Sequence, residues 1–336
     1  MKITSTAPMR VDLAGGTLDI FPLYLFEDGA STINAAVGIR SRVVVEARTD
    51  RKITICSKDL DMQVSAENLD DLVPEGPLDL VIRAVKYYRP ICGINVTTDN
   101  NIPKGSGLGA SSALLIALSH ALTRISGQKP DKEKIISIGA NIEAQSIRVP
   151  TGKQDYYPAS YGGISAIHFG VEGVKRRELT PPGDFLEEME DRTVLCFVGE
   201  PRFSGTTNWD MMKGYIDGND RVVKSLKKIK EIACKMKESV EDGNWMALAQ
   251  LLREEWDNRV NLAPGVTNPD INRTMGALRK QGALACKLCG AGGGGCMLSF
   301  TEEGAKPDIE RYLKDRGILV LPFKIERRGV KVVQDN

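Results

Sequence analysis

The chain has 336 residues, and its 45 Lys and Arg nearly balance its 44 Asp and Glu. This balance excludes the strongly basic surface typical of nucleic-acid-binding proteins, so we expect no nucleic-acid partner. The length favours two domains that each bury a core. No apolar run approaches the roughly 20 residues that cross a bilayer, and the N-terminus lacks a signal-peptide pattern. With seven irregularly spaced cysteines, we expect a cytoplasmic protein without a membrane partner.

The first half of the chain predicts alternating strands and helices. An extended stretch opens residues 2–20 and is broken by Gly15-Gly16. Strand patterns follow over residues 32–37, 42–47, 52–56 and 93–98, with a helix from Leu78 that must end before Pro90. Further helices are predicted over 111–126 and over 131–147, the second with Asp131 as N-cap. A loop over 150–155 and a strand over 164–169 complete this half.

A composition shift at Thr180-Pro181-Pro182-Gly183 marks the predicted domain boundary. We therefore expect one domain over residues 1–182 and a second over 183–336. The second half predicts a strand over 192–198 and a polar loop over 199–218. Amphipathic patterns predict helices over 220–240, 245–260, 268–281 and 306–316. Strands are predicted over 283–288, 296–300 and 317–325.

The strongest chemical signal is the segment Pro103-Lys104-Gly105-Ser106-Gly107-Leu108-Gly109-Ala110-Ser111-Ser112. Glycines at alternate positions allow the backbone to turn tightly and to approach a ligand closely. A helix beginning at the serines would direct free N–H groups and its positive dipole end into this loop. Such a loop is suited to bind phosphate. We interpret residues 103–112 as the nucleotide-phosphate loop of a small-molecule kinase.

Three other motifs are tested and set aside. The pattern G-x-x-x-x-G-K-[ST] is absent, since Lys104 precedes the glycines. A G-x-G-x-x-G match occurs over Gly290–Gly295, but it opens a strand rather than the helix that a dinucleotide site requires. The pair Cys286-x-x-Cys289 would place its thiols on opposite faces of a strand, which is poor for joint zinc ligation.

Three segments resemble the GHMP kinases when they are taken together and in their order along the chain. Residues 103–113 are similar to the P-x-x-x-G-L-x-S-S loop of that superfamily. Residues Ala7–Asp19 are similar to its N-terminal motif, in which an Arg precedes a sugar-binding Asp by nine residues, as Arg10 precedes Asp19. Lys287–Cys296 is similar to its C-terminal glycine-rich motif. The finer resemblance is to the sugar-1-kinase branch, especially D-glycero-D-manno-heptose 7-phosphate kinases, through Ala7–Asp19 and Gly152-Lys153-Gln154-Asp155.

The resemblance implies roles for individual residues. Asp155 is the expected catalytic group, which accepts or orients the proton of the attacking hydroxyl. Arg10 and then Lys153 are candidates for the cation beside it. Ser111, with Ser112 as the alternative, and Glu143 are expected to hold Mg²⁺, and ATP is the expected phosphoryl donor. The expected substrate-binding residues are Asp19, Gly16, Thr17, Gly152, Tyr161, Arg202, Gly292 and Gly293.

The resemblance also implies an α+β fold with two domains. The N-terminal domain should be a two-layer α/β domain with a left-handed βαβ crossover, an exception to the usual hand. The C-terminal domain should be a ferredoxin-like sandwich, with the site in the cleft between the two. A monomer or a homodimer is expected.

Three functions stay open from the sequence. The first is an ATP-dependent kinase that phosphorylates the anomeric hydroxyl of a sugar or sugar phosphate, with a heptose 7-phosphate as the best candidate. The second is a galactokinase-type or mevalonate-type small-molecule kinase. The third is a non-catalytic sugar sensor, against which the joint presence of Asp155, Glu143 and Ser111 argues.

Overall fold

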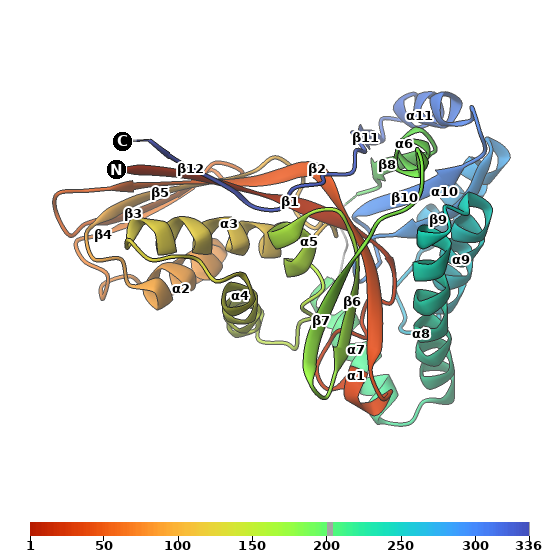
Figure 1. Cartoon of the computed structure of the whole chain (residues 1–336), viewed down its shortest axis with the longest axis horizontal. Coiled ribbons are helices and arrows are strands. Elements are labelled where there is room, and N and C mark those ends of the chain that lie inside the picture. The colour runs from red at the N-terminus through yellow and green to blue at the C-terminus, as the bar shows by residue number, and fades with distance from the viewer. Residues whose placement is uncertain (200–203, 336) are drawn as a thin grey trace.

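The computed structural model describes residues 1–199 and 204–335, and its backbone is organised around two β-sheets (Figure 1). The larger sheet follows the path β12-β1-β2-β5-β3-β4, and β6 and β7 extend it from β2. Its strands are β1 (Lys2–Ala14), β2 (Ala30–Ala47), β3 (Ile53–Ser57), β4 (Met62–Ala66), β5 (Ile94–Asn100), β6 (Ile164–Gly170), β7 (Gly173–Leu179) and β12 (Lys331–Asp335).

Strand β2 corrects one prediction from the sequence. The two runs over 32–37 and 42–47 are parts of one 18-residue strand. Its first part pairs with β6 and its second with β5. The register of β2 against β1 shifts between Pro8 and Met9. Such a bulge bends a strand without ending it, so two separate strands were the wrong interpretation.

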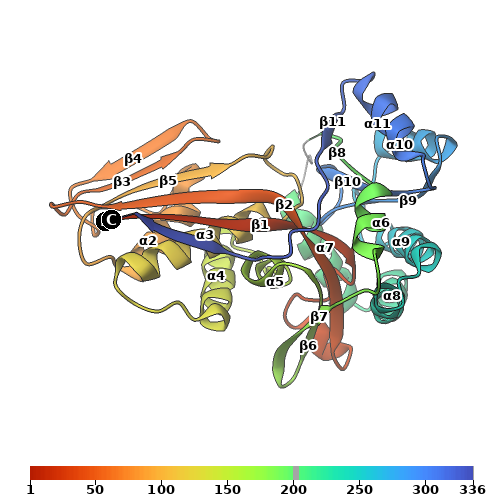
Figure 2. The ribbon, with the colours of Figure 1, turned by 45° about the horizontal axis from the view of Figure 1, so that its top comes forward.

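Four helices cover one face of the larger sheet, as Figures 1 and 2 both show: α2 (Asp79–Tyr88), α3 (Ala110–Ile125), α4 (Lys132–Ile147) and α5 (Tyr156–Tyr161). Helix α3 contacts β1 and β2, and nearly all of its side chains are buried, as its continuous apolar run predicted. The predicted N-cap of α4 is confirmed, because the Asp131 carboxylate accepts a hydrogen bond from the Lys134 N–H at 3.1 Å. Together, the sheet and these helices form the predicted two-layer unit.

The smaller sheet is antiparallel, with the order β11-β8-β10-β9. Its strands are β8 (Thr193–Phe197), β9 (Ala283–Leu288), β10 (Cys296–Thr301) and β11 (Leu319–Leu321). Helices α9 (Trp245–Arg259) and α10 (Pro269–Lys280) pack on β9, and α11 (Lys306–Lys314) packs on β8 and β11. This arrangement confirms the expected ferredoxin-like unit. Helix α8 (Asp220–Glu241) contacts α9 and also reaches β1 and β2 of the larger sheet.

The segment 199–218, predicted to be a polar loop, contains helix α7 (Ser204–Ile216). The prediction was wrong because Gly205 and the following Thr206-Thr207-Asn208 are weak helix formers. Tertiary packing supplies the missing stability, since Met211 and Met212 are buried in clusters that include Leu18 and Ile20.

Several short elements had no sequence signal that we recognised: α1 (Leu23–Phe26), α5, α6 (Phe185–Asp191), β4, β7 and β12. Strand β12 matters most for the architecture, because it pairs antiparallel with β1 and brings the end of the chain back to the larger sheet. The boundary at residue 182 and the hand of the crossover between the parallel strands β3 and β5 stay predictions. None of the described helices combines the length and apolarity needed to cross a membrane.

Candidate active site

A cavity of about 980 Å³ lies where the larger sheet, the N-terminus of α3 and the loops of the smaller sheet meet. This volume is typical of ligand sites. Most of the residues selected from the sequence line it, although they come from distant parts of the chain. They are Arg10, Gly16, Thr17, Asp19, Pro103, Lys104, Gly105, Ser106, Gly107, Gly109, Ala110, Ser111, Glu143, Gly152 and Asp155.

The predicted phosphate loop has a backbone geometry that suits an anion. Gly105, Gly107 and Gly109 have φ values of +74°, +73° and +70°, which favour glycine. Gly109 is the N-cap residue of α3, and no side chain caps this end of the helix. The first N–H groups of a helix have no partner within it. Since Ala110 and Ser111 line the cavity, this helix end presents N–H groups and its positive dipole end to an anion.

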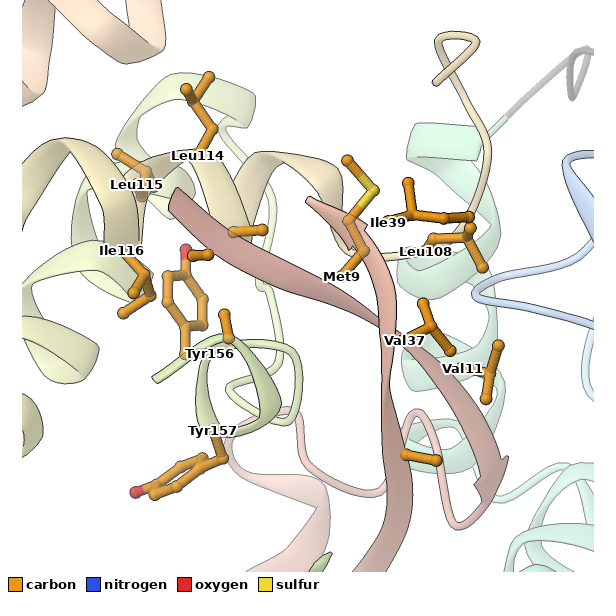
Figure 3. Packing of buried hydrophobic residues seen from close by; sticks show 14 of the residues in the cluster. Met9, Val11, Val37, Ile39, Leu108, Leu114, Leu115, Ile116, Tyr156 and Tyr157 are labelled. Atoms are coloured by element: carbon orange, nitrogen blue, oxygen red, sulfur yellow. The ribbon is translucent and has the colours of Figure 1, made fainter. Parts of the chain in front are cut away.

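Leu108 is the exception within the phosphate loop. It was expected among the nucleotide-binding residues, but its side chain is fully buried and belongs to the main hydrophobic cluster with Met9 and Ile39 (Figure 3). Its carbonyl accepts the Arg10 N–H at 3.0 Å. Leu108 therefore anchors the loop to β1. Ser112 also lies outside the cavity lining, and its hydroxyl donates to Glu143 at 3.4 Å.

Asp155 and Arg10 form a close ion pair at the cavity wall. The Nε of Arg10 donates to Asp155 Oδ1 at 2.7 Å, and Nη2 lies 2.6 Å from the same oxygen. Arg10 also donates to the carbonyl of Gly107, which joins the pair to the phosphate loop. Burial raises the pKa of Asp155 above its ordinary value, although the Arg10 charge opposes this. Arg10, rather than Lys153, is thus the cation beside Asp155.

Glu143 and Ser111 offer oxygen atoms that suit a magnesium ion. Ser111 Oγ donates to Glu143 Oε1 at 2.5 Å, and the Tyr156 hydroxyl donates to Oε2 at 2.6 Å. Burial raises the pKa of Glu143 above its ordinary value. A buried carboxylate beside a hydroxyl fits the few protein ligands that Mg²⁺ usually takes. The Tyr156 ring can reach Glu143 because position 139 of α4 is glycine, where a Cβ would lie 2.7 Å from the ring.

Asp19 also lines the cavity, where the Gly152–Asp155 loop holds it. Its side chain is 3% exposed, and Oδ2 accepts the backbone N–H of Gln154 at 3.0 Å. A Cβ on Gly152 would lie 1.8 Å from the same oxygen, so the close approach requires glycine. Burial raises the pKa of Asp19 to about 6, although the hydrogen bond from Gln154 opposes this.

The second glycine-rich segment supports the phosphate loop. The Cys296 N–H donates to the Ser106 carbonyl at 2.7 Å, and a Cβ on Gly107 would lie 2.3 Å from the Cys289 carbonyl oxygen. Gly292 and Gly293, expected to bind substrate, are absent from the cavity lining and pack against the Gly265–Val266 backbone instead. Of this segment, only Gly290 and Ala291 line the cavity.

Two other described residues from the predicted set are not brought into the cavity. The Tyr161 hydroxyl donates to Glu133 at 2.7 Å, and the tyrosine ring lies against Lys132 and Arg176, so we remove Tyr161 from the substrate set. Lys153 is half-buried but does not line the cavity. Arg202 lies outside the described residues.

A network of buried charges beneath the cavity was missed by the sequence analysis. Lys287 Nζ lies 2.5 Å from Asp12 Oδ2 and 3.4 Å from Glu255 Oε2, and Arg259 Nη2 lies 2.5 Å from Glu255 Oε1. All four side chains are at most 1% exposed. Although burial opposes ionisation, Lys287 and the nearby Arg10 lower the pKa of Asp12. The network joins β1, α9 and β9.

The network also bonds to backbone groups of two residues that line the cavity. Arg259 Nη2 donates to the Gly16 carbonyl at 3.0 Å, and the Gly290 N–H donates to Asp12 Oδ1 at 3.0 Å. Asp12 lies in the N-terminal motif Ala7–Asp19, and Lys287 opens the glycine-rich motif Lys287–Cys296. These two motifs were the signal that could have identified both residues as part of the site. Glu255 and Arg259 gave no signal beyond an ordinary i,i+4 pair on a helix.

The remaining wall of the cavity is mainly apolar and lies beside the phosphate loop. Such a wall, next to a phosphate-binding helix end, has room for the flat base of a nucleotide. Its apolar members are Leu60, Pro77, Leu80, Ile102, Leu114, Ile147 and Val149.

Comparison with known proteins agrees with this geometry. The profile of the GHMP kinases N terminal domain matches residues 79–163, and that of the GHMP kinases C terminal domain matches residues 236–319. The chain belongs to the GHMP kinase superfamily. It is therefore an ATP-dependent phosphotransferase with an alcohol acceptor.

Individual GHMP kinases resemble the chain over nearly its full length. A D-glycero-alpha-D-manno-heptose 7-phosphate kinase from Campylobacter jejuni is 28% identical and covers 98% of both chains. A mevalonate kinase from Thermococcus sibiricus is 24% identical over 99% of this chain and 98% of the other. The crystal structure of a D-glycero-D-manno-heptose 1-phosphate kinase from Bacteroides thetaiotaomicron superposes with a TM-score of 0.81 at 24% identity, covering 99% of each chain. The last comparison shows the shared fold.

Proposed function

We propose that this GHMP kinase transfers the γ-phosphoryl group of ATP to the anomeric hydroxyl of a sugar or sugar phosphate. D-glycero-D-manno-heptose 7-phosphate is the first acceptor to test, because the heptose kinase from Campylobacter jejuni matches the full chain. The observation that carries the proposal is the buried Asp19 carboxylate in the same cavity as Asp155. A carboxylate accepts hydrogen bonds from neighbouring hydroxyls, and a sugar offers several.

The chain's own residues supply positioning and charge for this transfer. The α3 N-terminus and the glycine loop hold the phosphates, and Arg10 adds positive charge beside them. The oxygen of the acceptor hydroxyl forms the new bond to the γ-phosphorus, and ADP leaves. Asp155 accepts the proton that this hydroxyl loses. Arg10 favours the ionised form of Asp155 that this step needs. Ser111 and Glu143 would hold Mg²⁺, which neutralises phosphate charge when bound.

An acceptor panel tests the proposal. Release of ADP is measured with the heptose 7-phosphate, galactose, fucose, mannose, mevalonate and homoserine at equal concentrations. We expect turnover with at least one sugar and formation of the 1-phosphate, identified by phosphorus NMR. Turnover with mevalonate or homoserine alone would show that the sugar assignment is wrong. Binding of a sugar without any ADP release would favour the non-catalytic sensor.

A further inference from the structure

One tryptophan differs from the other two in its surroundings. Trp245 and Trp256 are each 4% exposed, whereas the Trp209 side chain is 45% exposed and lines the active-site cavity together with Asn208. Phe21, Phe26 and Tyr87 are even more exposed, but they do not line the cavity. Exposure alone is common for single aromatic side chains, so the distinguishing feature of Trp209 is its place in the cavity lining. Ligand cavities commonly include aromatic side chains of this kind.

Helix α7, which carries Trp209, packs against residues that flank Asp19. Thr17 Oγ1 donates to Met211 Sδ at 3.4 Å, and Met212 packs in one cluster with Ile20 and Leu23. Trp209 lies within one helical turn of these methionines. Helix α7 packs on α8 and also contacts residues on both sides of Asp19.

Polar groups that line the same cavity complement the indole. Asp19 offers a buried carboxylate, and Gln154 beside it is 8% exposed and lines the cavity. Among the described residues, Gln154 Oε1 has no hydrogen-bond partner. A buried amide with an unpaired atom is unfavourable until another group pairs with it. The cavity lining therefore combines an unpaired amide oxygen, Gln154 Oε1, with the flat apolar indole of Trp209.

We infer that Trp209 is the surface on which the ring of the acceptor stacks, and that it determines specificity for cyclic acceptors. A sugar ring carries hydroxyls around its edge and C–H groups on its faces. The edge suits Asp19 and Gln154, and a face suits the indole, whose large apolar area is removed from water on contact. Acyclic alcohols such as mevalonate and homoserine have no such face. The inference rests on the proposed function for the identity of the acceptor.

Steady-state kinetics with the full chain test the inference. Trp209→Ala is expected to raise the KM of the sugar acceptor about tenfold or more, while Trp209→Phe keeps it within about threefold because a ring remains. The KM of ATP should change less than about twofold in both variants, since the adenine wall lies elsewhere. Ile216→Ala is the matched control, because Ile216 is an exposed apolar residue of the same helix that does not line the cavity.

A binding measurement separates this inference from the proposed function. Tryptophan fluorescence is titrated with mannose and with the heptose 7-phosphate in the absence of ATP. The wild type and Ile216→Ala should show a saturable change that Trp209→Phe lacks. If sugars bind with this signal but are never phosphorylated, the proposed function fails and the inference stands. If sugars are phosphorylated but Trp209→Ala leaves their KM unchanged, or raises the KM of ATP equally, the inference is overturned and the proposed function stands.

Discussion

Asp155 is 21% exposed and lies against one close cation, Arg10. Burial raises its pKa, but Arg10 contacts it through two nitrogens and opposes that rise. Arg10 is itself only 4% exposed, so its charge is weakly screened by solvent. The Arg10 charge thus opposes protonation of Asp155 beside the phosphate loop, while the carboxylate of Asp12 also interacts with both groups.

Replacing Asp155 with Asn tests its role as proton acceptor. The amide keeps the shape of the side chain but removes the charge, so kcat should fall by about 10²–10⁴-fold. The affinity for ATP, measured by calorimetry, should change little, because the loop N–H groups remain. Asp315→Asn, at an exposed position at the end of α11, is the control and should keep full activity. Wild-type turnover by Asp155→Asn would remove Asp155 from the mechanism.

The buried carboxyl of Asp19 opposes folding once it is ionised. Its pKa is raised by burial from 3.8 to about 6. Between these values the folded state binds more protons than the unfolded state, so this carboxyl makes stability fall as pH rises. Above pH 6, where Asp19 is ionised, the penalty reaches its full size of about 3 kcal/mol as an upper limit.

Asp19→Asn should therefore stabilise the protein and impair its function. At pH 7.5 we expect the free energy of unfolding in urea to rise by about 1–3 kcal/mol. The difference from wild type should shrink as pH falls below 6 and vanish near pH 4. The acceptor KM should rise in the same variant, because an amide accepts fewer hydrogen bonds than a carboxylate. A stability difference that is constant from pH 4 to 7.5 would contradict the raised pKa.

At the scale of elements, the phosphate loop is shaped by a second loop as much as by its own sequence. Gly107 faces the Cys289 carbonyl, and a Cβ on Gly295 would lie 2.7 Å from the Gly105 carbonyl oxygen. Two backbones can approach this closely only where neither carries a side chain. The glycines near residues 105 and 290 thus form one packed unit, although they are far apart in the sequence.

Two glycine substitutions separate backbone strain from this packing. Gly107 and Gly127 have φ values of +73° and +72°, but a Cβ on Gly127 would have no neighbour within 4 Å. Gly127→Ala should cost only the strain of about 1 kcal/mol. Gly107→Ala should cost about 1–3 kcal/mol more through overpacking, and it should raise the KM of ATP. Thermal unfolding and ATP kinetics measure both. Equal effects of the two substitutions would show that the contact with Cys289 is unimportant.

At the scale of the molecule, the two sheets are joined by buried charges. Asp12 lies on β1 of the larger sheet, Lys287 on β9 of the smaller sheet, and Glu255 on α9. Removing one member of such a network leaves a buried charge with neither a partner nor water around it. The resulting loss of stability is therefore much larger than the net stabilisation that the intact network provides. We expect the network to fix how the smaller sheet's loops meet the phosphate loop.

Lys287→Met removes the cation that Asp12 and Glu255 share and leaves Asp12 without its closest cation. The free energy of unfolding should fall by about 3–5 kcal/mol. Lys175→Met is the control, because Lys175 forms an exposed pair with Glu172, and it should change stability by less than about 0.5 kcal/mol. Urea unfolding of both variants provides the measurement. A loss below about 1 kcal/mol for Lys287→Met would mean that the network does not join the sheets.

The predictable part of the fold was the part encoded locally. Apolar periodicity gave α2, α3, α8 and the strands of the smaller sheet, because each pattern reflects one buried face. The pattern failed for α7, whose stability comes from Met211 and Met212 packing on Leu18 and Ile20. It failed for β12 as well, since this strand is mainly exposed and exists because β1 offers it an edge.

The sequence by itself determined the motifs on which the proposed chemistry depends: the glycine loop before a helix, Arg10 nine residues before Asp19, and the spacing of Glu143 and Asp155. Only the tertiary structure decided which cation faces Asp155 and that Gly292 and Gly293 support a loop rather than a substrate. It also revealed the buried charges and the position of Trp209. The physical reason is the sequence separation over which each effect acts, because dihedral preferences and apolar periodicity involve only residues that are close in the sequence. Ion pairs, burial and close backbone contacts join segments that only the folded chain brings together.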